Sequence, residues 1–445
     1  QVGRSSIVPA AAIVAVGFGG FVGSLWPMAV DTERSRSPRG RLASTGHALD
    51  TCAPMNDDRG PQAVRIPLGH PPVVFSPPEC HGLASQVLAH LSWQLGACLF
   101  KTFDNGEISV KLEQSVANRD VFVICARDDD ESEPPFALMR LMLLIQAIRL
   151  EHPYRVTVIM PALEYARQDR RLIAGEAIPP RLLLRCMKTA GADRYIVMDL
   201  HNQAEAAFSP PGAVLDEMSA DKYLAHFIRC EVPEFDPDKI LVCATNGGGM
   251  KFTRRMADEL RTGFIMAERF RSKAGGPGEI KIITDYDSRA EHITGIIIVD
   301  DMFDTCGSLA SVCEALRAFA PEGKLYAIAP HGYFSADAHL RIKKLVETCS
   351  LEWLAVTNSI AQRGAQRRFH SVGLKGRVRV VDISRLIAGA IIRIHLGDSV
   401  NLPSFRNLCP SEIDPALAEA AKVPQNQYTH IAGIRKATPK AVMWD

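Results

Sequence analysis

The residues with the clearest chemical potential lie in GIIIVDDMFDTCGSLASVCEAL, residues 295–316. An apolar run of strand length ends in the adjacent carboxylates of Asp300 and Asp301, and a helical pattern begins near Leu309. The turn between them holds Asp304, Thr305, Cys306, Gly307 and Ser308. Hydroxyls and backbone N–H groups at a helix N-terminus favour a phosphate group, whereas paired carboxylates would repel it and suit sugar hydroxyls, directly or through a metal ion. The segment therefore predicts a phosphosugar-binding loop, and the alternative is an ordinary polar strand-to-helix turn.

Two other segments carry polar groups that suit a nucleotide. In YARQDRR, residues 165–171, Arg167 offers a planar guanidinium fork for phosphate and Gln168 can hydrogen-bond a base. His201 ends the run MDLH and so lies at the carboxyl end of an apolar strand. The alternatives are a solvated basic loop for the first segment and a structural histidine for the second.

The elements that must position these residues follow an α/β pattern from about Val73 onward. Apolar runs of strand length occupy residues 121–125, 156–160, 195–199, 240–244, 295–299 and 325–330. Helix-length segments between them occupy residues 136–149, 180–189, 250–260 and 309–319. This alternation predicts parallel sheets covered by helices on both faces, in which ligands bind beyond the carboxyl ends of the strands.

A family resemblance emerges from several motifs together. VDDMFDTCGS resembles the ribose-5-phosphate loop of the phosphoribosyltransferase superfamily, and Cys306 is like the form found in eukaryotic phosphoribosyl-pyrophosphate synthetases. Other motifs similar to that family follow in the same order: FDNGEISV (103–110), YARQDRR (165–171), MDLH (198–201), PHGYFS (330–335) and VVDISRLIAGAIIRIHLGDSV (380–400). The resemblance covers roughly residues 72–402. It implies two tandem phosphoribosyltransferase-type αβα domains, 72–213 and 214–402, with homo-oligomers, ATP, ribose 5-phosphate and Mg²⁺.

The resemblance also implies a role for each motif. Phe103, Asn105 and Glu107, which alone would predict only a hairpin, would reach the ATP of a neighbouring subunit. Arg167 and Gln168 would contact adenine and phosphate. The remaining assignments are His201 to a metal ion, and Asp300, Asp301, Asp304, Thr305, Cys306, Gly307 and Ser308 to ribose 5-phosphate.

Two departures from the family pattern fall where the chemistry needs charge. The family's mobile catalytic loop has a Lys and then an Arg two positions on. In FIMAERFRSKAGG (264–276) Arg269 matches the Arg, whereas Ala267 stands at the Lys position. In the pyrophosphate loop Asn246 replaces a carboxylate that would help to hold Mg²⁺, and a neutral amide is a much poorer Mg²⁺ ligand. Because cations neutralise the charge that moves in pyrophosphoryl transfer, these changes predict retained binding with reduced or lost catalysis, in which case Mg²⁺ need not be present.

The N-terminal part of the chain differs from the rest. Residues 7–30 are 24 positions without a charge, long enough for a helix to cross the hydrocarbon layer, so we expect a transmembrane anchor in residues 1–30. A buried core helix is the alternative. Ala15, Gly19 and Gly23 give one face a stripe of small residues that suits packing against another membrane helix.

The region after this segment suggests an orientation for the anchor. Residues 31–71 lack a regular pattern and predict a linker, as residues 403–445 predict a C-terminal extension. The linker carries Arg34, Arg36, Arg39 and Arg41 close to the apolar segment, which places the main body in the cytoplasm or the mitochondrial matrix. Because the chain begins with Gln, we expect a presequence to have been removed, which favours the mitochondrial inner membrane.

The overall composition limits the classes of partner and cofactor. The 445 residues carry a formal net charge of +1, which gives no reason to expect a nucleic-acid partner. The 11 cysteines are scattered without a Cys-x-x-Cys pair, as expected for reduced thiols without a structural zinc. The sequence therefore favours a membrane-anchored, catalytically impaired subunit of a membrane complex. The alternative is an active ribose-phosphate pyrophosphokinase.

Overall fold

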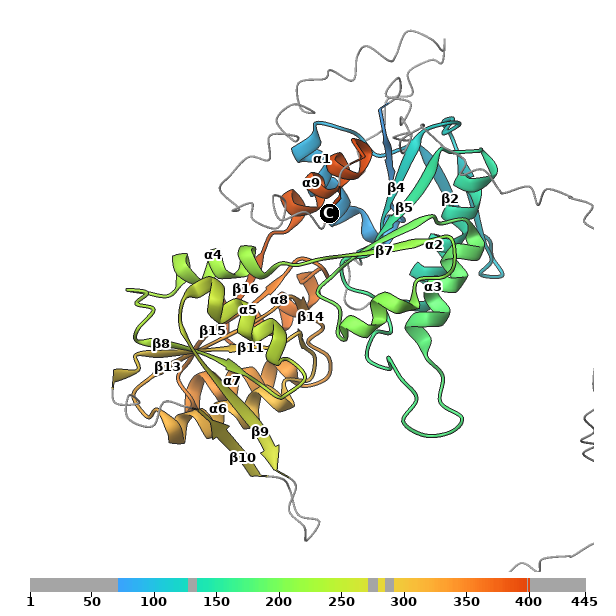
Figure 1. Cartoon of the computed structure of the whole chain (residues 1–445). Helices are drawn as coiled ribbons and strands as arrows, with labels where there is room; N and C mark the ends of the chain where they lie inside the picture. The colour runs from blue at the N-terminus through green and yellow to red at the C-terminus, as the bar shows by residue number, and fades with distance from the viewer. Residues whose placement is uncertain (1–70, 127–133, 271–278, 285–291, 398, 401–445) are drawn as a thin grey trace, which may run out of the picture. The chain divides into compact units, whose positions relative to one another are not determined.

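The computed structural model describes residues 71–126, 134–270, 279–284, 292–397 and 399–400 (Figure 1). The predicted anchor in 1–30, nearly all of the predicted linker in 31–71 and the predicted extension in 403–445 lie outside these residues. Within the described part of the chain, no helix is both long enough and apolar enough to cross a bilayer.

The first sheet is entirely parallel. Its strands run in the order β1 (Val73–Phe75), β4 (Asp120–Ile124), β5 (Arg155–Ile159), β6 (Arg194–Met198) and β7 (Val214–Met218). Its other elements are η1 (Pro78–Cys80), α1 (His81–Leu91), α2 (Pro134–Leu150), α3 (Pro179–Ala190), η2 (Gln203–Phe208) and the hairpin of β2 (Cys98–Thr102) and β3 (Ile108–Leu112).

The second sheet is parallel except at one edge, where β10 runs antiparallel to β9. Its order is β10 (Glu279–Ile283), β9 (Gly263–Phe270), β8 (Ile240–Ala244), β11 (Gly295–Val299), β13 (Lys324–Ala329), β15 (Leu351–Thr357) and β16 (Val378–Val381). The connecting elements are α4 (Asp221–Glu231), α5 (Met250–Leu260), α6 (Gly307–Phe319), α7 (Ala338–Thr348), α8 (Arg363–Ser371), α9 (Ser384–His395) and the short paired strands β12 (Met302–Phe303) and β14 (His331–Gly332).

Helices cover both faces of each sheet, as the strand composition predicts. The strands β4, β8 and β11 are buried along their whole length, because apolar side chains point to both faces. The helices α2 and α3 cover one face of the first sheet, and α6, α7 and α8 cover one face of the second. A third cluster of buried residues joins the remaining two faces through α1, α4, α5 and α9.

The helix α9, which is the last element in the part of the chain that the structure describes, returns to the first sheet after the second is complete. Its apolar side chains pack in the same buried cluster as those of α1, and the Ser384 hydroxyl lies 3.0 Å from the His90 ring. At its other end Arg155 donates to the Ile394 carbonyl oxygen at 2.9 Å, and the His395 ring lies 3.2 Å from Asp120. The core of the first sheet therefore includes residues from the far end of the chain.

The predicted strands and helices agree with the structure to within one or two residues, but the predicted domain boundary does not. A boundary after residue 213 is wrong because β7, at Val214–Met218, is the edge strand of the first sheet and pairs with β6. The apolar pattern does not predict this strand, because Asp216 and Glu217 interrupt it. The Asp216 carboxylate pairs with Arg194 on β6, which explains how an acidic residue is accommodated there.

Candidate functional site

A cleft of about 640 Å³ lies beyond the carboxyl ends of β6, β8 and β11. The residues predicted from sequence that line it are Arg167, Gln168, His201, Asn246 and Asp301. They come from loops that follow three parallel strands and from the β5–α3 loop, so the sheet edges bring together residues that are far apart in sequence.

Two charged side chains from different sheets meet at the centre of this cleft. Nδ1 of His201 lies 2.5 Å from a carboxylate oxygen of Asp301. Hydrogen bonding to Asp301 raises the pKa of His201, although burial acts in the opposite direction. Burial opposes ionisation of Asp301, but the hydrogen bond and charge of His201 hold its pKa below the ordinary value. The pair is therefore an imidazolium and a carboxylate at mildly acidic pH.

The neighbouring carboxyl group of Asp300 is in a different state. It is buried, and burial together with the charge of Asp301 raises its pKa to about 8. The backbone N–H of Asp301 donates to it at 3.0 Å. Two adjacent acids thus have separated pKa values, so at neutral pH one carboxyl group can donate a hydrogen bond while the other accepts one.

The loop after β12 forms an open N-terminus for α6. Cys306 precedes the helix in the left-handed conformation, with φ of +58°, and no side chain caps the first turn. The backbone N–H groups that begin at Gly307 therefore have no side-chain acceptor within the described residues, and the hydroxyls of Thr305 and Ser308 flank them. Arg341 holds the loop by donating to the Thr305 carbonyl oxygen at 2.6 Å. This arrangement suits a phosphate group.

Asp304 ties this loop to the cleft. Its two carboxylate oxygens accept hydrogen bonds from Arg167 and from the Ser335 hydroxyl. Arg167, the guanidinium fork predicted for a nucleotide phosphate, is thus paired with an acid of the predicted ribose-phosphate loop.

The glycine-rich loop at the start of α5 is closed by its own Asn246. The side-chain oxygen of Asn246 accepts hydrogen bonds from the N–H groups of Gly248 at 2.7 Å and Gly249 at 3.1 Å. Its amide nitrogen donates to Thr245 at 3.1 Å. A Cβ atom added at Gly247 would lie 3.6 Å from a carboxylate oxygen of Glu268. Two N–H groups of the loop, those of Gly248 and Gly249, are therefore occupied, and an acid lies beside the loop.

The two catalytic-loop positions on β9 do not line the cleft. Ala267 is 1% exposed and packs in the core shared with α6. Arg269 points elsewhere and donates to the Ser311 hydroxyl on α6 at 3.2 Å. The predicted catalytic Arg269 is thus not brought together with His201 and Asp301.

The predicted ATP-contact residues of the hairpin also lie away from the cleft. Asn105 forms a tight turn by accepting the Glu107 N–H at 3.1 Å, and Lys101 lies over the Phe103 ring. The Phe103 side chain is 43% exposed. The hairpin is confirmed as a structure, and within this chain its tip does not contribute to the cleft.

Sequence reasoning did not identify Arg255 and Asp199, which also line the cleft. Arg255 lies 3.8 Å from a carboxylate oxygen of Asp199 and 3.4 Å from one of Asp221. Burial raises the pKa of Asp199 to about 7. The helical spacing of Arg255 on α5 gives no sign of these ion pairs, because Asp199 follows β6 and Asp221 begins α4, and only tertiary folding brings them to Arg255.

His331 was part of a recognised motif, but its position could not be foreseen. Its ring is buried, with Nε2 3.0 Å from the Met198 carbonyl oxygen and Nδ1 2.9 Å from the Ser359 hydroxyl. Burial lowers the pKa of His331. A neutral ring that donates to the end of β6 thus connects the two sheets beneath the cleft.

The side chains around the cleft do not form a three-ligand metal site. Within the described residues, no three His, Cys, Asp or Glu side chains gather closely enough to hold a cation. His201 is engaged with Asp301, and the Asn246 oxygen is engaged with glycine N–H groups. These donors do not fit a cation held by three protein ligands.

Comparison with known proteins agrees with this arrangement of two sheets and strand-end loops. Residues 72–191 match the N-terminal domain of ribose phosphate pyrophosphokinase, and residues 278–406 match the phosphoribosyl synthetase-associated domain. The chain belongs to the phosphoribosyl-pyrophosphate synthetase family. The synthetase from Mycobacterium smegmatis is 27% identical, with a TM-score of 0.61 over 73% of this chain and 99% of that chain.

Several phosphoribosyltransferases match only part of the chain. The adenine phosphoribosyltransferase from Saccharomyces cerevisiae is 20% identical over 25% of this chain and 66% of that chain, with a TM-score of 0.20. The xanthine-guanine-hypoxanthine phosphoribosyltransferase from Helicobacter pylori is 21% identical over 26% of this chain and 77% of that chain, with a TM-score of 0.20. These local similarities carry no functional argument.

Proposed function

We propose that this family member binds ribose 5-phosphate and a nucleotide but is impaired in pyrophosphoryl transfer. The observation that carries the proposal is the closure of the glycine-rich loop by Asn246, whose side-chain oxygen takes the two N–H groups that an anion would need. A pyrophosphate group entering this loop must first break both hydrogen bonds.

Two features of β9 support the loss of catalysis. A transferring pyrophosphoryl group requires positive charge, and catalysis by positioned charge is lost when the charge is absent or misplaced. Ala267 supplies none and faces the core, and Arg269 is engaged with Ser311. The phosphate-binding half of the site is different, because the α6 N-terminus with Thr305 and Ser308 is open to a phosphate.

We further propose that the chain acts as an anchored subunit of a membrane complex. The uncharged run at 7–30, its small-residue stripe and the arginines that follow support a membrane span with the body in the mitochondrial matrix. Other membrane-protein subunits are then the expected partners, alone or with a second copy of this chain. Mild-detergent extraction of native membranes followed by native electrophoresis tests this, and migration only as a free homo-oligomer would contradict it.

An active ribose-phosphate pyrophosphokinase is the second candidate. It is favoured by the presence of Arg167, Gln168, His201 and Asp301 in one cleft. An assay of the full chain with ATP, Mg²⁺ and ribose 5-phosphate, coupled to detection of phosphoribosyl pyrophosphate, separates the two. The proposal expects no turnover above background, and sustained wild-type turnover would overturn it.

Calorimetric titration with ribose 5-phosphate tests the binding half of the proposal. We expect saturable binding that Ser308→Ala weakens roughly 10- to 150-fold, the effect of about 1.5–3 kcal/mol for one lost hydrogen bond to a charged group. Ser311→Ala is the matched control, because Ser311 lies on the same helix and accepts from Arg269 instead. No heat of binding with the wild type would contradict retained ligand binding.

A further inference from the structure

Two thiols from separate elements of the chain lie side by side in the buried cluster that the first sheet forms with α2 and α3. Cys80 ends η1 and Cys125 follows β4, and their sulfur atoms are 3.7 Å apart. Cys80 is fully buried and Cys125 is 5% exposed. A disulfide requires a sulfur–sulfur distance of about 2.05 Å, so the two atoms need to approach by roughly 1.7 Å.

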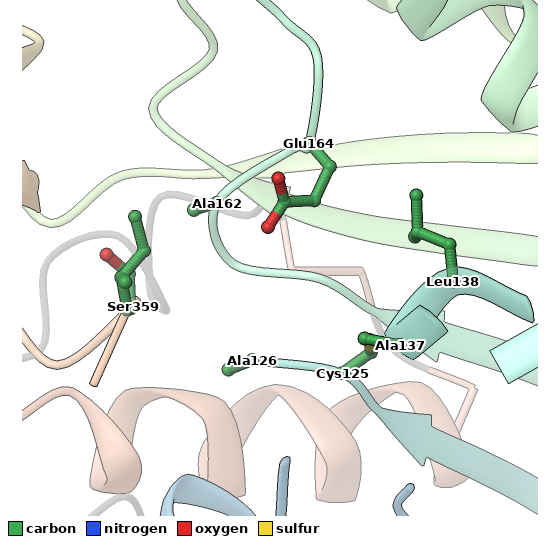
Figure 2. A pocket seen from close by; sticks show the side chains of 8 residues that line it. Cys125, Ala126, Ala137, Leu138, Ala162, Glu164 and Ser359 are labelled. Atoms are coloured by element: carbon green, nitrogen blue, oxygen red, sulfur yellow. The ribbon is translucent and has the colours of Figure 1, made fainter. Parts of the chain in front are cut away.

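One of the two thiols borders a small cavity. The cavity has a volume of about 10 Å³, and its lining includes Cys125, Ala126, Ala162, Glu164 and Ser359 (Figure 2). This volume matches one water-sized molecule. The Glu164 carboxylate points into the same space (Figure 2). Cys125 therefore borders a space that holds one small molecule, whereas Cys80 is not among the residues that line it.

We propose that Cys80 and Cys125 form a thiol pair that hydrogen peroxide converts to a disulfide. Cys125 loses its proton to water or to Glu164 and attacks one peroxide oxygen. The O–O bond breaks, hydroxide leaves and takes up a proton to become water, and Cys125 becomes a sulfenic acid. The Cys80 sulfur then attacks the Cys125 sulfur and the S–OH bond breaks, releasing a second water. The two thiols give up two electrons and two protons, and the peroxide is reduced to two waters.

The bond would fasten the start of α1 to the carboxyl end of β4. The strands β1 and β4 are already paired in parallel register just before these two cysteines. The disulfide closes a loop of 45 residues, the separation of the two cysteines, and so restricts the unfolded chain. The oxidised protein is therefore expected to melt at a higher temperature than the reduced protein.

Peptide mapping of the full chain tests the pair directly. The protein is treated with hydrogen peroxide, remaining thiols are alkylated, and a non-reducing digest is analysed by mass spectrometry. We expect a cross-linked pair containing Cys80 and Cys125, two hydrogens lighter than the separate peptides and released by dithiothreitol. Cys125→Ser should abolish it, whereas Cys230→Ser, which changes an exposed cysteine, should leave it intact.

Two results would overturn the proposal, and neither depends on a variant folding. In the first, the folded protein is treated with enough peroxide to oxidise Cys230 and is then unfolded, and both Cys80 and Cys125 still react with the alkylating reagent. The other is that Cys125 advances to a sulfinic acid while Cys80 remains a thiol. A rise in the melting temperature of the oxidised wild type, absent from Cys80→Ser, would support the disulfide independently.

Discussion

The ring of His201 is hydrogen-bonded to the carboxylate of Asp301, although one hundred residues separate them in the sequence. His201 follows β6 in the first sheet and Asp301 follows β11 in the second. The pair joins the loop after β6 to the loop after β11 across the cleft. The strength of this ion pair depends on the charge of His201, so the interaction is sensitive to pH.

Replacing His201 with Gln should reduce stability in a pH-dependent way. The folded pKa of His201 is raised above 6.5, so its contribution is fully present below pH 6.5 and is lost as pH rises through the folded pKa. Because the pair is partly exposed and screened by solvent, we expect a loss of about 0.5–1 kcal/mol at pH 6 and less at pH 9. Urea unfolding at the two pH values measures this. His370→Gln on the exposed end of α8 is the control, and an equal loss at both pH values would contradict the prediction.

Replacing Glu205 with Gln should stabilise the protein at alkaline pH. The Glu205 carboxyl group is fully buried with neither oxygen hydrogen-bonded, and burial raises its pKa to about 8. The folded state therefore holds a proton that the unfolded state releases between about pH 4.5 and 8, and wild-type stability falls as pH rises through that window. We expect the free energy of unfolding of Glu205→Gln to exceed that of the wild type by about 1–3 kcal/mol at pH 8.5 and by less at pH 5. A difference in unfolding free energy between Glu205→Gln and the wild type that is the same at both pH values would contradict this prediction. Glu322→Gln, at an exposed position, is the control.

Removing the Asn246 side chain should open the glycine-rich loop to anions. Asn246→Ala frees the N–H groups of Gly248 and Gly249, so we expect at least about threefold tighter binding of inorganic pyrophosphate, the effect of one hydrogen bond. Loss of the turn should reduce stability by about 1 kcal/mol. Asn105→Ala removes a similar turn at the hairpin tip, outside the cleft, and should not change the affinity. Unaltered pyrophosphate binding in calorimetry with Asn246→Ala would show that the loop is not closed in solution.

Restoring a lysine at position 267 should not restore catalysis. Ala267 faces the apolar core under α6, so the ammonium group of Ala267→Lys would be buried without a partner. We expect a loss of about 2–4 kcal/mol in unfolding free energy and no gain in turnover. Phe270→Lys, at the exposed end of the same strand, removes the contact of Lys281 with the Phe270 ring but buries no charge, so it should reduce stability by only about 0.5–1 kcal/mol. Appearance of phosphoribosyl pyrophosphate with Ala267→Lys would mean that β9 rearranges to bring this position into the cleft.

The sequence was informative where local pattern determines structure. The fully apolar runs that became β4, β8 and β11 could be read directly, and so could the loop from Asp300 to Ser308. Local pattern could not show that Asn246 bonds to its own loop, because an Asn followed by glycines is compatible with an open or a closed turn. It also could not show that Ala267 faces the core, since orientation in a strand depends on register. Arg255 and Asp199 meet only through tertiary contacts.

The packing of α9 against the helices of the first sheet affects how the protein folds during its synthesis. The ribosome releases the strands β1, β4, β5, β6 and β7 long before it releases Ser384–His395. The buried cluster that covers α1 is complete only when α9 packs beside that helix. The first sheet and α1 therefore keep apolar surface exposed until the second sheet and α9 have been synthesised. A chain truncated before α9 would lack part of the buried core on one face of the first sheet.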